Sequence, residues 1–504
     1  MQSGVKLPNL ANDDLLGLAD KNALTVHAGS SGDRFSLGTF HPDHSLNQPA
    51  GIRDDRHIFI VAGSRAGKGV SMIVPNLLSW QGGVFCIDPK GENASITAMR
   101  RGSEEQAKGT GTSVRQFIGQ KVAILDPMGT VKGPAKKYRV AYDPLQDIAI
   151  GSDDEGGQIL AVTDSIVMAE SGSGAHWTEN AGSIFAGIIE AVLHLEPPER
   201  RTLTYCRKIY QQGMDKLPEY LRLAPDTPAG LALDALTLLE DAGPEEAGSF
   251  STTLNRQLRF LTDPRIQRHM KAGTFSLTRA VRENWSVYIC LPPSQISRMN
   301  RWLRLLVRTA LDAKMAEGFE HSGPQSLFLL DEFYSLGNMQ QIEESAAYMA
   351  GYGIKLVPII QNIGQVKKLY QSNWETFLGN AGAIVAWGLN DLETEKYISD
   401  RLGSVMTWEV SESVGSSREP KKIFASSLST NKSAALHERP VRRPNEVHED
   451  ATRETMRAFV IPASTPPFMV LRSAYMDKAP AQIFDSPQFI REWEARHGTN
   501  TQTA

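Results

Sequence analysis

The chain carries a series of short apolar runs, each of which ends on small or polar residues. The first, residues 57–62, reads HIFIVA and precedes Gly63. Runs of this length without alternation are typical of parallel strands that are buried on both faces of a sheet. Further runs lie at residues 83–88, 122–126, 287–291, 326–330, 355–360 and 383–387. The spacing leaves room for crossover helices, so we expect an α/β fold with a mostly parallel sheet.

Between residues 148 and 286 the apolar pattern changes to helical spacing. Ile159, Val162 and Ile166 lie three or four positions apart, and the same spacing returns from Ile184 to Ile188. This predicts an all-α domain inserted between two parts of one sheet. We expect an N-terminal extension with short strands near residues 24–27 and 35–40 (1–50), a first sheet-forming part (51–147), the all-α domain (148–286), a second sheet-forming part (287–480) and a polar tail (481–504).

Residues 57–80 carry the clearest candidate chemistry. An apolar run leads into a turn of small residues that ends at Lys68, and an apolar stretch able to form a helix follows. Strand, small-residue loop, lysine and helix is the layout of a phosphate-binding P-loop. The loop N–H groups and the helix N-terminus surround the phosphates, and the lysine adds a full positive charge. The expected nucleotide contacts come from Gly63, Ser64, Arg65, Ala66, Gly67, Lys68, Gly69 and Val70.

The loop departs from the generic P-loop pattern at two positions. Ala62 replaces the first glycine, which is a mild change because Gly63 beside it can adopt unusual backbone angles. Gly69 stands where a Ser or Thr hydroxyl would bind Mg²⁺, and Ser71 and Thr110 are too far along the chain to be assumed substitutes. For the loop alone, a glycine-rich turn of an ordinary α/β protein is the alternative.

A second candidate region, residues 326–337, lies far downstream. Its apolar run ends in Asp331 and Glu332, and the carboxyl end of a buried parallel strand is where open α/β sheets bind ligands. Asp331 is placed to hold Mg²⁺ or its water shell, and Glu332 to orient or deprotonate a water molecule. A solvated strand end is the alternative for such a pair, and the upstream P-loop favours the catalytic interpretation.

Together these segments resemble the TraG/VirD-type family of type IV secretion coupling proteins. The resemblance is carried by SRAGKGVSMIVPNLLSW, CIDPKGE, LLDEFYSLG, GYGIKLVPIIQNIGQV and WGLNDLETEKYISDRLG. In this family a glycine commonly follows the P-loop lysine, as Gly69 does here. The resemblance implies a RecA-like P-loop ATPase domain that is interrupted by an all-α domain, so the two sheet-forming parts would be one nucleotide-binding domain.

The resemblance also implies ATP and Mg²⁺ as cofactors. It assigns phosphate binding to Lys68, the metal to Asp331, water activation to Glu332 and γ-phosphate sensing to Gln361, for which a capping amide is the alternative. The resemblance also implies a hexameric motor, in which a neighbouring subunit supplies an arginine finger. The turn at residues 350–352 lacks the arginine that some relatives carry, so the finger is unassigned and the candidates are Arg65, Arg301, Arg304 and Arg401.

The resemblance further implies partners and a location. The expected partners are single- or double-stranded DNA, a relaxase or effector protein, and components of a type IV secretion channel, with a homo-hexamer as the assembled form. Family members usually begin with transmembrane helices, but the first residues here lack the pattern of a signal peptide, and no stretch is apolar enough to span a bilayer. We therefore expect a form without an N-terminal transmembrane region, cytoplasmic and peripheral at the bacterial inner membrane.

Charge and cysteine content narrow these expectations. The formal net charge is −4, so any DNA contact must be local rather than a property of the whole surface. Cys86, Cys206 and Cys290 have no paired or metal-like spacing, which fits a reducing cytoplasm.

Two alternatives to a secretion motor are open. A soluble adaptor that binds nucleotide and mainly recruits protein cargo would suit the acidic charge and the missing finger, although Glu332 argues against it. A chromosome-segregation translocase of the FtsK type shares the ATPase fold, but the helical insertion favours secretion. Locally, residues 176–181 form either a substrate-contacting loop or a helix start with Trp177 packed inward, and residues 407–440 form a mobile loop or a strand pair.

Overall fold

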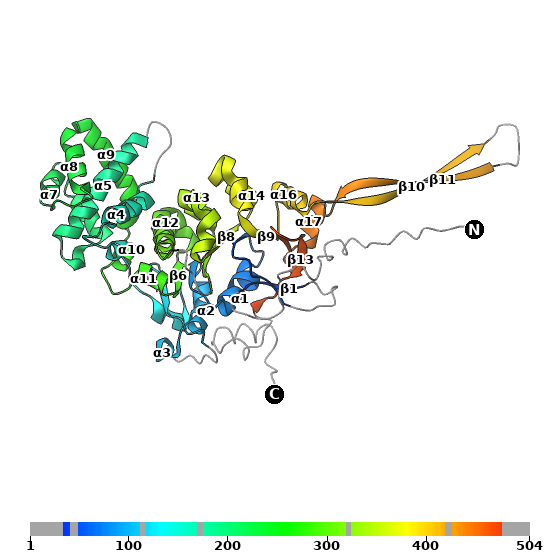
Figure 1. Ribbon diagram of the computed structural model, residues 1–504, viewed down its shortest axis with the longest axis horizontal. Helices are drawn as coiled ribbons and strands as arrows, with labels where there is room; N and C mark the ends of the chain where they lie inside the picture. Colours follow the sequence, from blue (N-terminus) through cyan, green and yellow to red (C-terminus); the bar gives the residue numbers. More distant parts are fainter. Residues whose placement is uncertain are drawn as a thin grey trace.

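The computed structural model describes residues 34–40, 49–110, 117–168, 175–318, 324–418 and 426–475. Its centre is a sheet of 11 strands (Figure 1). In spatial order these are β2 (Pro49–Ile52), β1 (Phe35–Phe40), β13 (Phe468–Leu471), β12 (Arg457–Pro462), β9 (Ala381–Trp387), β3 (His57–Ala62), β8 (Ile354–Ile360), β7 (Ser326–Leu330), β4 (Val84–Asp88), β6 (Ser286–Cys290) and β5 (Val122–Leu125).

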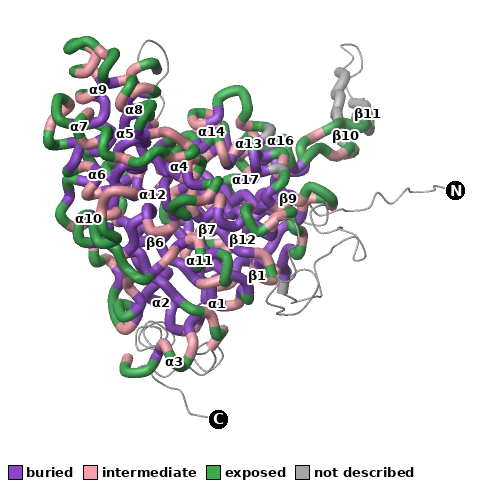
Figure 2. The backbone as a smooth tube through the Cα atoms, turned by 60° about the vertical axis from the view of Figure 1, so that its left-hand side comes forward, coloured by how far each residue is buried: buried purple, intermediate pink, exposed green. Residues whose placement is uncertain are grey.

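The strands from β9 to β5 pair in parallel, whereas β12, β13, β1 and β2 extend the sheet in antiparallel fashion beyond β9. All residues of the parallel strands are buried, as the central part of Figure 2 shows. The rings of Phe85 on β4 and Phe328 on β7 stack with centroids 5.2 Å apart. The expected mostly parallel α/β sheet is therefore confirmed, and burial on both faces explains its continuous apolar runs.

A helical segment follows β3, and further helices connect later strands of the sheet. A π-helical turn, η1 (Gly69–Ile73), directly precedes α1 (Val74–Ser79), so the type of helix changes beside Pro75. Pro75 is the second residue of α1, so its missing N–H coincides with the change of helix type. The other helices that pack near the site are α2 (Glu92–Arg101), α12 (Pro293–Met315), α13 (Gln340–Met349), α14 (Ile363–Tyr370) and α16 (Leu392–Leu402).

Between β5 and β6 the described residues form helices and turns only, in the lobe at the left of Figure 1. The main helices are α4 (Glu155–Ile166), α5 (Ala175–Leu195), α6 (Leu203–Tyr210), α7 (Leu217–Leu221), α8 (Leu231–Asp241), α9 (Pro244–Gln257), α10 (Pro264–His269) and α11 (Leu277–Arg282). Trp177 lies in the first turn of α5, and its ring centroid is 5.9 Å from that of Phe250 on α9. The helix-start interpretation of residues 176–181 is therefore confirmed.

A two-stranded antiparallel hairpin projects from the opposite end of the molecule (Figure 1). It consists of β10 (Ser404–Arg418) and β11 (Ser426–Pro440), with Ser404 paired to Pro440 at its base. The strand-pair interpretation of residues 407–440 is therefore confirmed. The expected strand at 24–27 and the tail after residue 480 lie outside the described residues. Within the described ranges, no helix has both the length and the apolar composition needed to cross a membrane.

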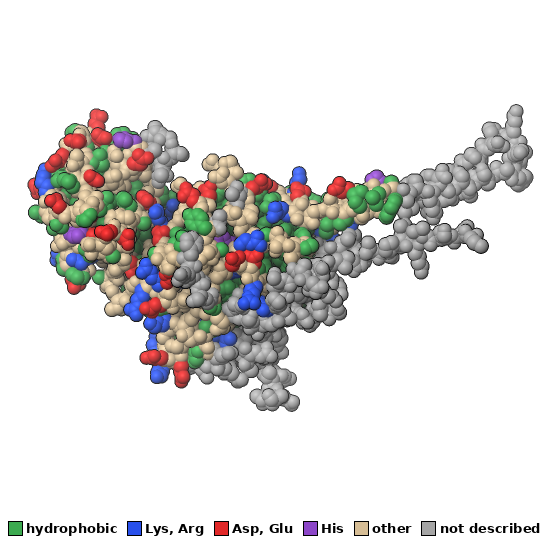
Figure 3. All heavy atoms as spheres, in the orientation of Figure 1, with side chains coloured by type: hydrophobic (Ala, Val, Ile, Leu, Met, Phe, Trp, Pro, Cys, Tyr) green, Lys and Arg blue, Asp and Glu red, His purple; other side chains and the backbone are tan. Residues whose placement is uncertain are grey.

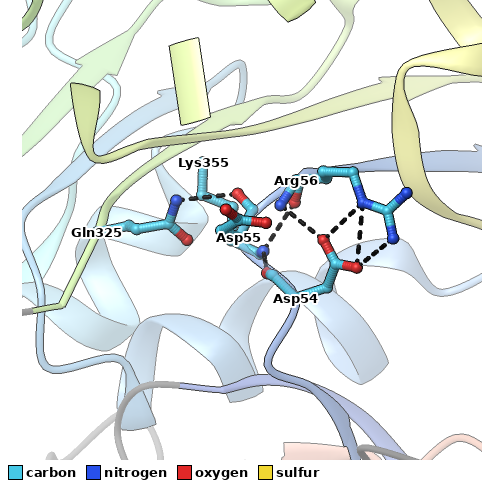
Figure 4. Close-up of polar contacts among 5 residues, drawn as sticks. All are labelled: Asp54, Asp55, Arg56, Gln325 and Lys355. Carbon is cyan, nitrogen blue, oxygen red and sulfur yellow. Dashed lines mark hydrogen bonds and ion pairs between the residues drawn. The ribbon is translucent and has the colours of Figure 1, made fainter. Parts of the chain in front are cut away.

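A polar cluster ties the amino ends of β3, β7 and β8 together (Figure 4). Lys355 donates from Nζ to the carbonyl oxygen of Arg56 at 2.8 Å and also to that of Asp54. Gln325 Nε2 donates to the carbonyl oxygen of Asp55 at 2.9 Å. Burial lowers the pKa of Lys355 to about 8. These contacts hold β8 beside β3 at the edge of the sheet opposite the candidate site.

Candidate functional site

The candidate site lies at the carboxyl ends of neighbouring parallel strands. β8 lies between β3 and β7, and β4 follows β7. The strands therefore bring the loop containing Lys68, the pair Asp331 and Glu332, and Gln361 to one edge of the sheet. The residues predicted from two distant segments and a third strand end are thus grouped as expected for a ligand site of an open α/β sheet.

The loop after β3 depends on close backbone packing. A Cβ at Gly63 would lie 2.0 Å from the carbonyl oxygen of Gly388, so only glycine fits there. Gly67 has φ of 82°, and Arg65 also adopts the left-handed region with φ of 59°. Trp387, the last residue of β9, donates from its indole Nε1 to the carbonyl oxygen of Ala66 at 2.9 Å. These contacts place Lys68 directly at the start of η1.

Acidic side chains converge opposite Lys68. Burial raises the pKa of Asp331 to about 6, the positive charge of Lys68 opposes this rise, and Glu332 adds to it. Burial also raises the pKa of Asp88 to about 7, and the negative charge of Asp331 contributes to that rise. The charge of Asp331 acts on Asp88, and the charges of Lys68 and Glu332 act on Asp331, so these groups share one region, where a divalent cation would offset the negative charge.

Asp88 also has a structural role. Its Oδ2 accepts a hydrogen bond from the backbone N–H of Ala94 at 2.8 Å, in the first turns of α2. This bond accounts for the turn that follows β4.

Glu332 is held in an uncommon backbone conformation. Its φ of 61° and ψ of 41° lie in the left-handed region, which costs a non-glycine residue about 1–3 kcal/mol. The Glu332 Oε2 atom accepts a hydrogen bond from Gln361 Nε2 at 3.4 Å. Gln361 donates from its backbone N–H to Gln365 Oε1 at 2.9 Å, which orients the end of β8. The carboxylate and the amide proposed for water activation and sensing are therefore direct neighbours.

The donor set fits Mg²⁺ bound together with phosphate oxygens. Among the described residues, no three His, Cys, Asp or Glu side chains form a metal cage. Mg²⁺ commonly uses one or two carboxylates and completes its shell with waters and phosphates, so Asp331 suits it. Ser71 offers no substitute for the missing hydroxyl at Gly69, because its Oγ donates to the Gly67 carbonyl oxygen at 3.0 Å and accepts from Arg472 at 2.9 Å.

The four arginines considered as finger candidates have different surroundings. Arg301 donates from Nε to Gln257 Oε1 at 2.8 Å, and Arg304 donates from Nη1 to the Leu336 carbonyl oxygen at 2.8 Å. Both arginines are therefore hydrogen-bonded within their own chain. Arg65 and Arg401 are exposed.

Sequence reasoning missed one buried cation at the site. Arg472, at the end of β13, donates from Nη1 to the carbonyl oxygen of Ala66 at 3.2 Å and to Ser71 Oγ. No motif in the sequence around Arg472 indicates this contact.

Comparison with known proteins places these features in a family. The family described as Type IV secretory system Conjugative DNA transfer matches residues 17–501. The conjugal transfer protein TraG of Escherichia coli is 28% identical over 369 residues, which cover 69% of this chain and 55% of TraG. VirD4 of Agrobacterium fabrum (strain C58 / ATCC 33970) is 26% identical over 352 residues, covering 69% of this chain and 49% of VirD4. The chain spans about half the length of these relatives.

Solved structures share the fold at low sequence identity. The unbound conjugative coupling protein TrwBdeltaN70 aligns with a TM-score of 0.58 and 15% identity, over 92% of this chain and 91% of that chain. TrwB in complex with ADP and Mg²⁺ aligns with a TM-score of 0.53 and 15% identity, over 83% of this chain and 85% of that chain. Because the family match extends over nearly the whole sequence and the fold agrees with it, the chain belongs to the type IV secretion coupling proteins of conjugative DNA transfer.

Proposed function

We propose that this chain binds ATP with Mg²⁺ and hydrolyses it to drive DNA or nucleoprotein into a type IV secretion channel. The observation that carries the proposal is the contact between Glu332 and Gln361 at the strand ends beside the Lys68 loop. TrwB, whose fold this chain shares, has been seen in complex with ADPNP and with ADP and Mg²⁺. This similarity supports a nucleotide at the corresponding strand edge.

In the proposed mechanism, the N–H groups of residues 63–70 and the ammonium of Lys68 hold the phosphate chain. Asp331 would hold Mg²⁺, which would offset the phosphate charge. Glu332 orients the attacking water and accepts its proton, and it is therefore the general base. Gln361 contacts Glu332 and reports the presence of the γ-phosphate to β8.

We propose that DNA binds to one restricted region of the surface. The face shown in Figure 3 carries acidic and basic side chains side by side in its described part, in line with the net charge of −4. DNA contact would therefore be confined to one region, such as the channel of a homo-hexamer. In that assembly a neighbouring subunit would supply Arg65 or Arg401 as the finger, because both are exposed. The assembly would act at the inner membrane through partner proteins.

The direct test is steady-state ATP hydrolysis by Glu332→Gln. Loss of the carboxylate should lower turnover by about 10²–10⁴-fold, because a general base contributes that much, while nucleotide binding persists. Glu105→Gln, on the exposed surface of α3 (Glu104–Ala107), is the matched control and should hydrolyse like the wild type. Equal turnover by Glu332→Gln and wild type would refute the assignment of Glu332, and nucleotide binding without hydrolysis by the wild type would favour a nucleotide-binding adaptor.

A further inference from the structure

The guanidinium of Arg472 lies beneath the phosphate-binding loop. The residue is 2% exposed, and its Nη1 donates to the Ala66 carbonyl oxygen at 3.2 Å and to Ser71 Oγ at 2.9 Å. Its Nη1 also lies 3.9 Å from where a Cβ of Gly67 would be. One side chain directly after β13 therefore contacts the loop and η1, on both sides of Lys68.

The remaining contacts of Arg472 are with neutral groups. Nε donates to the Arg457 carbonyl oxygen at 3.3 Å and Nη2 to the Thr452 carbonyl oxygen at 3.1 Å. The guanidinium carbon lies 4.8 Å from the ring centre of Trp387. No carboxylate in the described ranges forms an ion pair with Arg472. The site therefore holds a buried positive charge that none of the described side chains neutralises.

Burying an unpaired charge is costly, and the cost falls when an anion binds nearby. Burial lowers the pKa of Arg472 to about 10, so the group is still charged at neutral pH. Electrostatic attraction is stronger in such a water-poor environment than in bulk solvent. The loop above Arg472 is the proposed binding site of the nucleotide phosphate chain, which is strongly negative.

Arg101 provides an internal comparison. It is also completely buried, and it donates to the carbonyl oxygens of Leu77, Trp80 and Gly82. Arg101 contacts the chain that leads into β4, at the amino edge of the sheet, far from the strand ends that carry the site. A purely structural buried arginine therefore exists in this fold, and location distinguishes Arg472 from it.

We propose that Arg472 is a positioning residue for the nucleotide phosphates, which fixes the loop at Ala66 and Ser71 and supplies positive charge beneath it. The inference rests on the proposed nucleotide binding. It makes the antiparallel strands β12 and β13 part of the nucleotide site, although they lie outside the parallel sheet. It also gives Ser71 a role as an acceptor for Arg472 rather than a metal ligand.

The test is calorimetric titration of the full chain with ADPNP and with AMP, both in the presence of Mg²⁺. Arg472→Met should weaken ADPNP binding by about tenfold to hundredfold and AMP binding much less, because the lost charge acts on the phosphates. Arg101→Met is the matched control and should change the melting temperature without changing the preference for ADPNP. A folded Arg472→Met protein with the wild-type preference would overturn the proposal.

A second variant keeps the test decisive if Arg472→Met fails to fold. Arg472→Lys retains the charge at pH 7, but burial lowers the pKa of a lysine in this place. Its preference for ADPNP over AMP should therefore fall between pH 7 and pH 9, whereas the wild-type preference changes little there, because Arg472 with a pKa of about 10 stays mostly charged. A flat profile identical to that of the wild type would overturn the proposal. Absence of ADPNP binding by the wild type would instead refute the proposed function and, with it, this inference.

Discussion

Gln361 donates from its side-chain amide to the carboxylate of Glu332 across 3.4 Å, although the two residues come from different strands. The contact joins the end of β8 to the end of β7, on the side of the sheet where the loop of Lys68 lies. A change at the γ-phosphate that moves the amide would therefore also move the proposed general base.

Gln361→Ala should uncouple these two groups. We expect ATP turnover to fall by about tenfold to hundredfold, because the carboxylate loses a neighbour that orients it, while nucleotide affinity changes little. Turnover and affinity are measured by steady-state hydrolysis and by calorimetry. Gln340→Ala, at an exposed position of α13, is the control. A variant at Gln361 that hydrolyses ATP at the wild-type rate would show that the contact has no catalytic role.

Gly388→Ala should displace the P-loop, because Gly388 packs directly against Ala66. Its added Cβ would lie 2.5 Å from the Cβ of Ala66, at a residue with φ of 60°. We expect destabilisation of about 1–3 kcal/mol together with weaker nucleotide binding, because the loop must shift. Gly230→Ala tests backbone strain alone, since it has φ of 64° and no atom within 4 Å of the added Cβ. If both variants bind nucleotide equally well, the packing of Gly388 does not shape the loop.

The apolar runs sufficed to predict the parallel sheet because burial on both faces leaves a strong sequence signal. Strands, a small-residue loop and polar strand ends then placed Lys68, Asp331, Glu332 and Gln361 on one edge. The roles of these residues in catalysis stay predictions until the variants are measured.

Other parts of the site had no local signal. Arg472 contacts Ala66 across 406 sequence positions and Ser71 across 401, and no pattern within a strand reports a contact of that range. Lys355 lies in a run that predicts a strand, but its burial depends on backbone oxygens of Asp54 and Arg56 in the segment before β3. Whether a polar residue is buried depends on tertiary contacts of this kind, and a single sequence does not reveal them.

Asp331→Asn should separate nucleotide binding from metal use. With Mg²⁺ present, we expect about tenfold weaker nucleotide binding, because an amide replaces the charged oxygen ligand. In excess EDTA, wild type and variant should bind equally, since no metal is held. Calorimetric titrations under both conditions measure the difference. Equal affinity of the two proteins in Mg²⁺ would contradict the assignment of Asp331 to the metal.

His57 should make the stability of the protein depend on pH. Its Nε2 donates to the Ala346 carbonyl oxygen at 2.7 Å, and its Nδ1 accepts from the Leu356 N–H at 3.2 Å, so the ring is held neutral. Burial lowers the pKa of His57 to about 4, and the charge of Lys355 adds to this effect. The unfolded state therefore binds the proton first, and stability falls as pH drops from about 6.5 towards 4.

His57→Gln removes the titrating ring and keeps a polar side chain. Between pH 7 and pH 4.5, the wild type should lose on the order of 1–3 kcal/mol of unfolding free energy more than the variant does. Urea denaturation at each pH measures both values, and their difference cancels the contributions of other titrating groups. Parallel stability profiles for the two proteins would show that His57 is protonated equally in the folded and unfolded states.

The measurement that tests the central claim most directly is steady-state ATP hydrolysis by the purified chain, with and without single- and double-stranded DNA, beside Lys68→Ala. The account predicts hydrolysis that DNA stimulates and that Lys68→Ala abolishes, because the ammonium holds the phosphates during transfer. Hydrolysis that persists unchanged in Lys68→Ala would contradict the account, since the loop after β3 would then not be the nucleotide site.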